Sequence, residues 1–213
     1  MSPVRGLFIA FEGVEGAGKS TQVARLAARL QARGIEPVVV REPGGTALGE
    51  EARRLVLHGK DELSPAAELF LYLVARAELV SRVVRPALTE GRIVIADRYE
   101  LSSRAYQAGG RGLPESGVKA AIALATGGLV PDLYVVLDLD PEGGRGRQRA
   151  QGKPPDRIER ADASFHERVA EAFGTAAGPN VIHVAAGAAP EAVADDVWRV
   201  VEARFGSHLA AYG

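Results

Sequence analysis

The feature that most constrains this chain is the run Gly13-Val14-Glu15-Gly16-Ala17-Gly18-Lys19-Ser20, which fits the P-loop pattern G-x-x-x-x-G-K-[ST]. Its glycines let backbone N–H groups turn inward around an anion, while Lys19 adds a positive charge and the Ser20 hydroxyl can ligate Mg²⁺. The apolar run at 7–11 is typical of a buried strand, and the pattern over 21–33 is typical of a helix. This strand–loop–helix setting predicts a nucleotide-phosphate site, and the alternative is a glycine-rich turn that binds nothing.

Four further apolar runs, at 38–40, 93–96, 133–137 and 181–184, have the length and composition of buried strands. Gly34 is a stop signal for the first helical pattern, so a strand, a helix and a second strand follow one another closely. Such a βαβ unit implies a parallel sheet with a right-handed crossover. The 213 residues therefore predict an α/β fold in one domain, with no repeats or linkers.

A long helix is predicted from Ser64, an N-cap followed by proline, to a stop at Gly91. Tyr72 and Arg76 lie four residues apart on a face beside its apolar stripe. Helical spacing alone leaves two alternatives. Either Tyr72 packs in the core and Arg76 is a solvated charge, or both side chains face a ligand.

Acidic residues occupy two positions that suit phosphate chemistry. Asp97 comes at the carboxyl end of a predicted strand, where a carboxylate of a P-loop fold usually binds Mg²⁺ or its water shell. The alternative is that Asp97 is the N-cap of a helix. Glu15 lies inside the loop, where a carboxylate is unfavourable unless it binds a hydroxyl or a cation. Glu15 is therefore a better functional candidate than most acids of this chain, and the stretch 102–111 reads as a helix and turn lining a pocket.

Five positive side chains fall within residues 145–157, where the glycines and prolines indicate a mobile loop. A charge run of this kind is usually a solvated face. Because the phosphates of a nucleotide carry concentrated negative charge, a closing basic lid is the functional interpretation.

The overall composition excludes several function classes. A formal net charge of −1 is unlike a general nucleic-acid binder or a polybasic membrane protein. Cysteine is absent, which excludes disulfides and thiolate metal sites and indicates a reducing compartment. The uncharged stretch 172–190 contains glycine and proline breaks, so it reads as helix end, turn and strand rather than a membrane span. We expect a cytoplasmic protein that uses none of its four scattered histidines in catalysis.

Together these motifs resemble bacterial thymidylate kinase, a P-loop family of the nucleoside monophosphate kinase-like class. The matching segments are FEGVEGAGKST (11–21), REPGGT (41–46), the helix through Arg76 to RPAL (85–88), DRYELSSRAYQAGGRG (97–112), PDLYVVLDLDPE (131–142) and DRIE (156–159). They follow in order over nearly the whole length, so we expect a single thymidylate kinase-like domain over 1–213. The P-loop alone would indicate only the broad class that binds nucleoside triphosphates.

The resemblance implies a five-stranded parallel sheet flanked by helices, with a mobile basic lid loop at about 145–158. It implies transfer of the ATP γ-phosphoryl group to dTMP with Mg²⁺, in dTTP biosynthesis. The implied partners are these small molecules and a second copy of the chain in a homodimer, with no nucleic acid and no membrane. The alternatives are another P-loop nucleotide or deoxynucleoside kinase, or a non-catalytic ATP-binding paralogue.

The resemblance also implies a role for individual residues. The residues expected to hold ATP and the metal are Gly13, Val14, Glu15, Gly16, Ala17, Gly18, Lys19, Ser20, Thr21 and Asp97, with Ser20 and Asp97 near Mg²⁺. Lys19, Asp97 and Arg98 are the expected catalytic residues outside the lid. The acceptor phosphate is already anionic, so Asp97 is expected to organise metal and water rather than to remove a proton.

The implied dTMP site uses residues from several segments. Arg41 and Arg98 would hold the phosphate, and Glu15 would meet the sugar 3′-hydroxyl. Tyr72 would stack on thymine, Arg76 would read its O4, and Tyr106 would leave no room for a ribose 2′-hydroxyl. The expected set is Glu15, Arg41, Tyr72, Arg76, Arg98, Ser103, Tyr106 and Gln107.

One departure from the family concerns the catalytic arginine. Some family members carry it in the P-loop after the acid, where this chain has Gly16, so the resemblance places the charge in the lid. The lid position aligns near Gln151, between Arg149 and Lys153. We expect Arg149 to take the catalytic role, with Arg145 and Lys153 on ATP.

Overall fold

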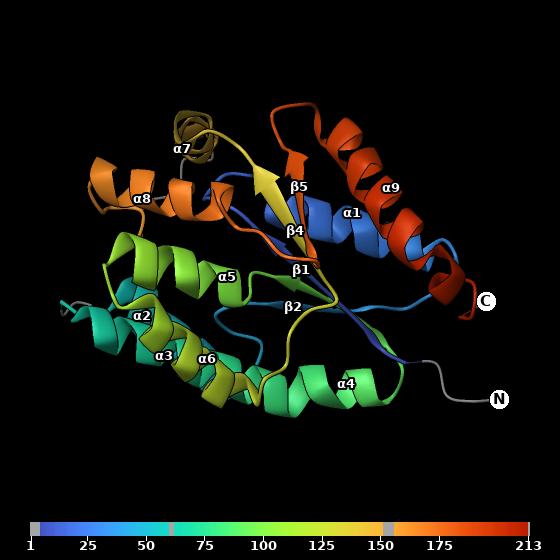
Figure 1. Cartoon of the computed structure of the whole chain (residues 1–213), viewed down its shortest axis with the longest axis horizontal. Helices are drawn as coiled ribbons and strands as arrows, with labels where there is room; N and C mark the ends of the chain where they lie inside the picture. Colours follow the sequence, from blue (N-terminus) through green and yellow to red (C-terminus); the bar gives the residue numbers. More distant parts are fainter. Residues whose placement is uncertain (1–4, 60–61, 151–155, 213) are drawn as a thin grey trace.

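The computed structural model describes residues 5–59, 62–150 and 156–212, and Figure 1 shows a sheet with helices packed around it. The strands are β1 (Leu7–Glu12), β2 (Val38–Arg41), β3 (Ile93–Asp97), β4 (Leu133–Asp138) and β5 (Val181–Ala185). Their spatial order is β2-β3-β1-β4-β5, and every neighbouring pair is parallel. The predicted five-stranded parallel sheet is therefore confirmed.

Helices cover both faces of the sheet. They are α1 (Lys19–Gln31), α2 (Ala47–His58), α3 (Pro65–Leu79), α4 (Arg85–Thr89), α5 (Glu100–Ser103), α6 (Glu115–Thr126), α7 (Pro141–Ala150), α8 (Ala163–Gly174) and α9 (Pro190–Leu209), with π-helical stretches at Val80–Val84 and Arg104–Gly110. Figure 1 shows α1 and α9 together on one side, while α3, α4 and α6 lie across the molecule.

The central strand β1 divides the core into two layers. It is buried along its whole length, as a strand covered on both faces must be. Ile9 and Phe11 point to the layer that contains α1 and α9, whereas Phe8 and Ala10 point to the layer that contains α3, α4 and α8. The chain leaves β1 at its carboxyl end as the P-loop, so the loop is held by the most deeply buried element of the fold.

Two predicted helices have different bounds in the structure. Helix α1 begins at Lys19 rather than at residue 21, because Gly18, with φ of 93°, turns the P-loop directly into the helix. The single helix predicted from 64 to 91 contains a π-helical turn between α3 and α4. Pro86 follows that turn. Because a proline has no N–H to donate and its ring crowds the carbonyl of the preceding turn, the wider π-helical turn accommodates it.

The prediction of a loop from residue 145 is wrong for its first six residues, because 145–150 continue helix α7. The Asp140 carboxylate accepts a hydrogen bond from the Gly143 N–H at 2.7 Å and so starts the helix. Arginine, glutamine and alanine then favour the helix more than isolated glycines oppose it. Residues 151–155 of the predicted lid lie outside the described residues, and 156–158 lie in a non-helical segment that enters a turn.

The uncharged stretch 172–190 forms the end of α8, a turn and β5, as its glycines and prolines predict. In the part of the chain that the structure describes, no helix combines the length and apolar character needed to cross a membrane.

Candidate active site

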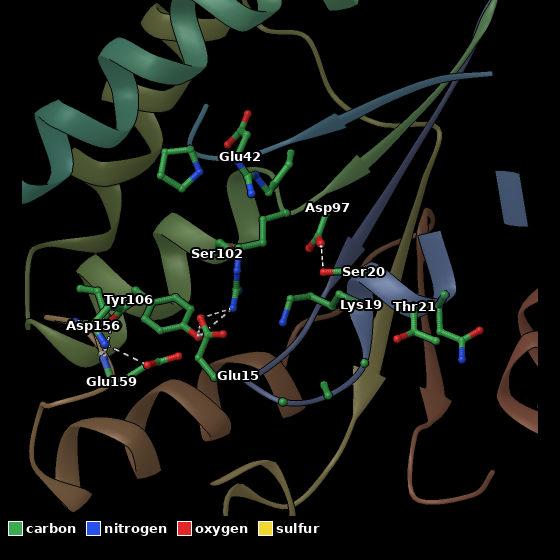
Figure 2. A pocket seen from close by; sticks show the side chains of 18 of the residues that line it. Glu15, Lys19, Ser20, Thr21, Glu42, Asp97, Ser102, Tyr106, Asp156 and Glu159 are labelled. Atoms are coloured by element: carbon green, nitrogen blue, oxygen red, sulfur yellow. Dashed lines mark hydrogen bonds and ion pairs between the residues drawn. The ribbon is translucent and has the colours of Figure 1, made fainter. Parts of the chain in front are cut away.

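A cleft of about 920 Å³ lies at the carboxyl ends of β1, β2 and β3. Figure 2 shows the P-loop side chains Lys19 and Ser20 on one side of it, and Tyr106 and Ser102 facing them. The predicted site residues that line the cleft are Glu15, Gly16, Ala17, Gly18, Lys19, Ser20, Thr21, Arg41, Tyr72, Asp97, Arg98, Ser103, Tyr106 and Gln107. The fold therefore brings segments far apart in sequence to one edge of the sheet, as expected for an open parallel sheet.

Lys19 is held inside the P-loop by the backbone of the loop itself. Its side chain is buried, and Nζ donates to the carbonyl of Gly13 at 3.0 Å and to that of Val14 at 2.7 Å. Burial lowers the pKa of Lys19 to about 8, repulsion by Arg98 adds to this effect, and attraction by Glu15 opposes it. The ammonium therefore lies where backbone N–H groups of the loop can share an anion with it.

Gly16 is required by packing against helix α7. It has φ of +74°, and a Cβ there would lie 2.3 Å from the carbonyl oxygen of Gly144. A Cβ on Gly144 would in turn lie 2.4 Å from the carbonyl oxygen of Glu15. Helix α7, which carries the basic run, therefore begins in direct contact with the P-loop.

Ser20 and Asp97 meet at the end of β3. The Ser20 hydroxyl donates to Asp97 Oδ2 at 2.5 Å, and the Asp97 side chain is buried. The N-cap of the following helix α5 is Tyr99, so the alternative that Asp97 is the helix cap is wrong. A hydroxyl and a carboxylate supply the hard oxygen ligands that Mg²⁺ prefers, so the residues present fit the predicted metal.

Arg98 links the P-loop to the opposite wall of the cleft. Its Nη2 pairs with the Glu15 carboxylate and donates to the Tyr106 hydroxyl at 3.3 Å, and its guanidinium lies 5.2 Å from the centre of the Tyr106 ring. Arg98 has φ of 76°, the one left-handed backbone conformation outside glycine among the described residues. The pKa of Glu15 is lowered because Arg98, Lys19 and Tyr106 outweigh its burial.

Arg76 is buried beneath the cleft rather than exposed in it. Its guanidinium donates to Glu42 at 2.7 Å, to the Ser103 hydroxyl at 3.0 Å and to the Tyr99 carbonyl at 2.8 Å. The alternative of a solvated charge is therefore wrong. Arg76 is absent from the cleft lining, whereas its ion-pair partner Glu42 is present. Glu42 Oε1 has no hydrogen-bond partner among the described residues.

The remaining predicted wall residues differ in how firmly they are held. Tyr72 is half-buried, and burial raises the pKa of its hydroxyl. Gln107 is buried and donates to Glu68 Oε1 at 2.9 Å. Arg41 is exposed and lies 3.5 Å from Glu50, so its side chain has the freedom to reach a ligand.

Two residues with clear roles in the site were not predicted from the sequence. Glu12 is fully buried and accepts hydrogen bonds from the segment after Arg98. Arg147 on α7 lines the cleft and donates to the Ala186 carbonyl at 3.0 Å. The basic run predicted that this segment faces the phosphates, but it did not single out Arg147 among the positive residues. That choice depends on which face of α7 lies against the P-loop.

The three residues predicted in the lid fall at or beyond the edge of the described structure. Arg145 and Arg149 belong to helix α7, but their side chains lie outside what the structure describes, and Lys153 lies outside the described residues altogether. Their roles stay predictions.

A P-loop on the central strand, a carboxylate on the neighbouring strand and arginines across the cleft define a P-loop kinase fold of the nucleoside monophosphate kinase-like class. The thymidylate kinase family model matches residues 11–197. The thymidylate kinase of Deinococcus radiodurans is 52% identical, with 79% of this chain and 82% of that protein covered. Those of Synechococcus sp. strain JA-3-3Ab and Gloeobacter violaceus are 48% and 46% identical, with 93% and 92% of this chain and 96% and 94% of those proteins covered. This chain belongs to the thymidylate kinase family.

Proposed function

We propose that this protein transfers the γ-phosphoryl group of ATP to dTMP, giving dTDP and ADP for dTTP biosynthesis. The observation that carries the proposal is that one cleft holds two separate sets of anion-binding groups. One set is the P-loop with Lys19, and the other is Arg41 and Arg98 at the ends of β2 and β3. Transfer between two nucleotides requires both phosphate groups to be held, and family membership supplies the identity of the acceptor.

The chemistry proposed for the cleft is positioning and charge stabilisation. The transition state of phosphoryl transfer spreads negative charge over equatorial oxygens, so Lys19 stabilises it with a localised cation. Arg41 and Arg98 hold the acceptor phosphate in line with the γ-phosphorus. Because that phosphate is already anionic, Asp97 organises the site and need not remove a proton.

Mg²⁺ is proposed to accompany ATP. The Ser20 hydroxyl and the Asp97 carboxylate, in contact at 2.5 Å, would hold the ion together with phosphate oxygens. When bound, the ion supplies further neutralisation of the charge that develops on the phosphate oxygens.

The base pocket is proposed to read thymine through α3 and the π-helical stretch after α5. Tyr72 stacks on the ring, Ser103 and Gln107 lie beside it, and Arg76 reads O4. Arg76 is almost fully buried and already donates to three groups, so it would have to reach O4 from beneath the wall of the cleft with a remaining N–H. Glu15 meets the 3′-hydroxyl, and the Tyr106 ring excludes a ribose 2′-hydroxyl.

The lid is proposed to be the end of α7 and the residues after it. Arg149 is the proposed catalytic cation, with Arg145 and Lys153 on the ATP phosphates. Arg147 adds a cation on the same helix at the cleft edge, next to the segment that begins α9. Closure of such a lid would exclude water and prevent hydrolysis of ATP.

A homodimer and a cytoplasmic location are also proposed. Large apolar side chains are exposed on the adjoining helices α2, α3 and α6, where Phe70 is 59% and Leu124 is 87% exposed. Leu48, Leu55 and Val74 are also exposed on these helices. A second copy of the chain covering these side chains would remove apolar area from water. The absence of cysteine supports a reducing compartment such as the cytoplasm.

An acceptor panel tests the proposed function. ADP release by the full chain is measured with ATP, Mg²⁺ and one acceptor at a time: dTMP, dUMP, ribothymidine monophosphate, dCMP, AMP or thymidine. We expect the highest kcat/KM with dTMP and no turnover of thymidine, which lacks the phosphate that Arg98 binds. Equal rates with all monophosphates, or turnover of thymidine, would contradict the proposal. ATP binding without any acceptor-dependent turnover would indicate a non-catalytic paralogue.

A further inference from the structure

Glu12 is a buried carboxylate that the proposed chemistry does not use. It is the last residue of β1, it is fully buried, and it does not line the cleft. Burial raises the pKa of its carboxyl, while a hydrogen bond from Ser102 and the charge of Arg98 oppose that rise. In the described structure the Glu12 side chain accepts three hydrogen bonds, and all of their donors lie within the segment after Arg98.

Glu12 caps the helix that follows Arg98. Its Oε1 accepts from the N–H of Tyr99 at 2.9 Å and from the N–H of Ser102 at 3.2 Å. Tyr99 is the N-cap of α5 and has no capping side chain of its own. These two N–H groups are the ones that a capping box satisfies from within a helix, and here one carboxylate on a neighbouring strand satisfies both.

This capping fixes the backbone on either side of Arg98. The Arg98 N–H donates to the Phe11 carbonyl at 2.9 Å, and the next residue is tied to Glu12. Arg98 itself has φ of 76°, a conformation that costs energy in a residue with a side chain and persists only where the surroundings enforce it. Adjacent residues of β1 therefore hold the two peptide groups that flank the left-handed residue.

Ser102, together with the Gly13 carbonyl and the Glu15 carboxylate, holds the side chain of Arg98. Arg98 Nη1 donates to Ser102 Oγ at 3.0 Å, and Ser102 Oγ donates to Glu12 Oε2 at 2.6 Å. Because a carboxylate can only accept, the hydroxyl proton of Ser102 is committed to Glu12 and its lone pairs face Arg98. The direction of both hydrogen bonds is thus set by the charge of Glu12.

We infer that Glu12 is a positioning residue that aims the Arg98 guanidinium at the acceptor phosphate, through Ser102 and through the cap of α5, without touching substrate. The inference rests on the proposed function, in which Arg98 binds the phosphate of dTMP. It predicts a loss confined to the phosphate, because the sugar and base are held by other residues.

Two variants interrupt this relay at different points. In Glu12→Gln the amide oxygen can still accept from the two N–H groups, but the amide nitrogen donates where the carboxylate accepted, so the Ser102 proton must turn towards Arg98. In Ser102→Ala the relay is removed, while the capping by Glu12 is untouched. Glu78→Gln is the matched control, because Glu78 pairs with the exposed Arg82 and neither residue lines the cleft.

The test is the affinity of the full chain for dTMP and for thymidine, measured by isothermal titration calorimetry for the wild type and the three variants. We expect Glu12→Gln and Ser102→Ala to weaken dTMP binding by about tenfold, the value of one hydrogen bond to a charged group, with thymidine binding within about twofold of wild type. Glu78→Gln should bind both ligands as the wild type does.

The outcomes separate this inference from the proposed function. Unchanged dTMP affinity in Ser102→Ala, in a wild type that prefers dTMP to thymidine, would overturn the inference alone. An equal loss of dTMP and thymidine binding would also overturn it, because it would show a general role in the fold. A wild type with no preference for dTMP over thymidine would contradict the phosphate role of Arg98, and with it both proposals. If Glu12→Gln does not fold, Ser102→Ala decides the question.

Discussion

The two sides of the cleft are built in different ways. The donor side, residues 13–21 of the P-loop, is one contiguous segment whose groups are mainly backbone N–H groups and Lys19. The acceptor side, formed by Arg41, Glu42, Tyr72, Arg98 and Tyr106, comes from four separate segments, and side-chain hydrogen bonds or ion pairs hold Glu42, Arg98 and Tyr106.

The two sides therefore respond differently to the loss of a single side chain. The shape of the donor side follows from local backbone conformation. Few of its single side chains are therefore important, and Lys19 is the main exception. On the acceptor side, buried charges hold one another: Arg76 is fixed by Glu42, and Arg98 by Glu15 and, through Ser102, by Glu12. Removing one member there leaves another charge buried and unpaired, which is costly.

The largest expected effect is on the donor side. Lys19→Met should lower kcat by about 100-fold or more, because it removes a cation that stabilises the transition state. Lys119→Met serves as the control, since Lys119 is exposed on α6 and pairs with Glu115. Steady-state ADP release measures both variants, and near-normal turnover of Lys19→Met would remove this residue from catalysis.

The next largest effect should come from the buried ion pair of the acceptor side. Glu42→Gln leaves the Arg76 charge buried, so we expect a loss of unfolding free energy of about 3 kcal/mol, together with a higher KM for dTMP and an unchanged KM for ATP. Glu78→Gln, which breaks an exposed pair with Arg82, should cost less than about 0.5 kcal/mol. Urea denaturation measures the free energies of unfolding, and steady-state kinetics measure the KM values. Equal losses of unfolding free energy in the two variants would contradict the special cost of the buried ion pair.

A smaller effect is expected at Tyr106. Its hydroxyl lies 3.3 Å from Arg98 Nη2 and 3.3 Å from Glu15 Oε1, at the proposed position of the sugar. Tyr106→Phe should reduce the preference for dTMP over ribothymidine monophosphate by about tenfold, since loss of one hydroxyl relaxes a steric and polar constraint. The ratio of the two kcat/KM values measures it, and an unchanged ratio would refute the assigned role.

The smallest effect is predicted outside the cleft, at the pair His183 and Asp138. Burial alone would lower the pKa of His183, but bonds to the Ala176 carbonyl and to Asp138 outweigh it, so the pKa is raised. A raised folded pKa stabilises the protein below the unfolded value of about 6.5, and this contribution is lost as the pH rises through the folded value.

Asp138→Asn tests this sign. Because the pair is partly exposed, the variant should be less stable than wild type at pH 5.5 by no more than about 0.5 kcal/mol, and the difference should shrink at pH 8.5. Denaturant unfolding at the two pH values measures it. A difference that grows with pH would show that the linkage has the opposite sign.

The same contrast explains what the sequence could and could not predict. The strands, the α/β class and the P-loop were predictable, because apolar runs and a contiguous motif depend on local sequence. The family motifs also indicated Arg41, Tyr72 and Arg98, which line the cleft. The burial of Arg76 against Glu42 was not predictable from helical spacing, because the partner comes from a loop 34 residues earlier.

Glu12 and helix α7 show the same limit. In the sequence Glu12 looks like an ordinary residue at the end of a strand. Its contacts come from the turn after β3, a different strand of the sheet. The glycine within 145–150 indicated a loop, but this segment is helical. The preceding Gly144 lets α7 approach the P-loop closely, and sequence rules that consider only neighbouring residues do not predict such a contact. Such contacts need the tertiary structure.

In the proposed reaction the γ-phosphoryl group passes from ATP on the donor side to dTMP on the acceptor side. A single-turnover quench experiment with γ-labelled ATP, Mg²⁺ and dTMP follows this transfer itself. The label should appear in the β-phosphate of dTDP in an amount equal to the ADP formed, and no label should be transferred without dTMP. Label released as inorganic phosphate, or ADP formed at the same rate in the absence of dTMP, would contradict direct transfer between the two nucleotides.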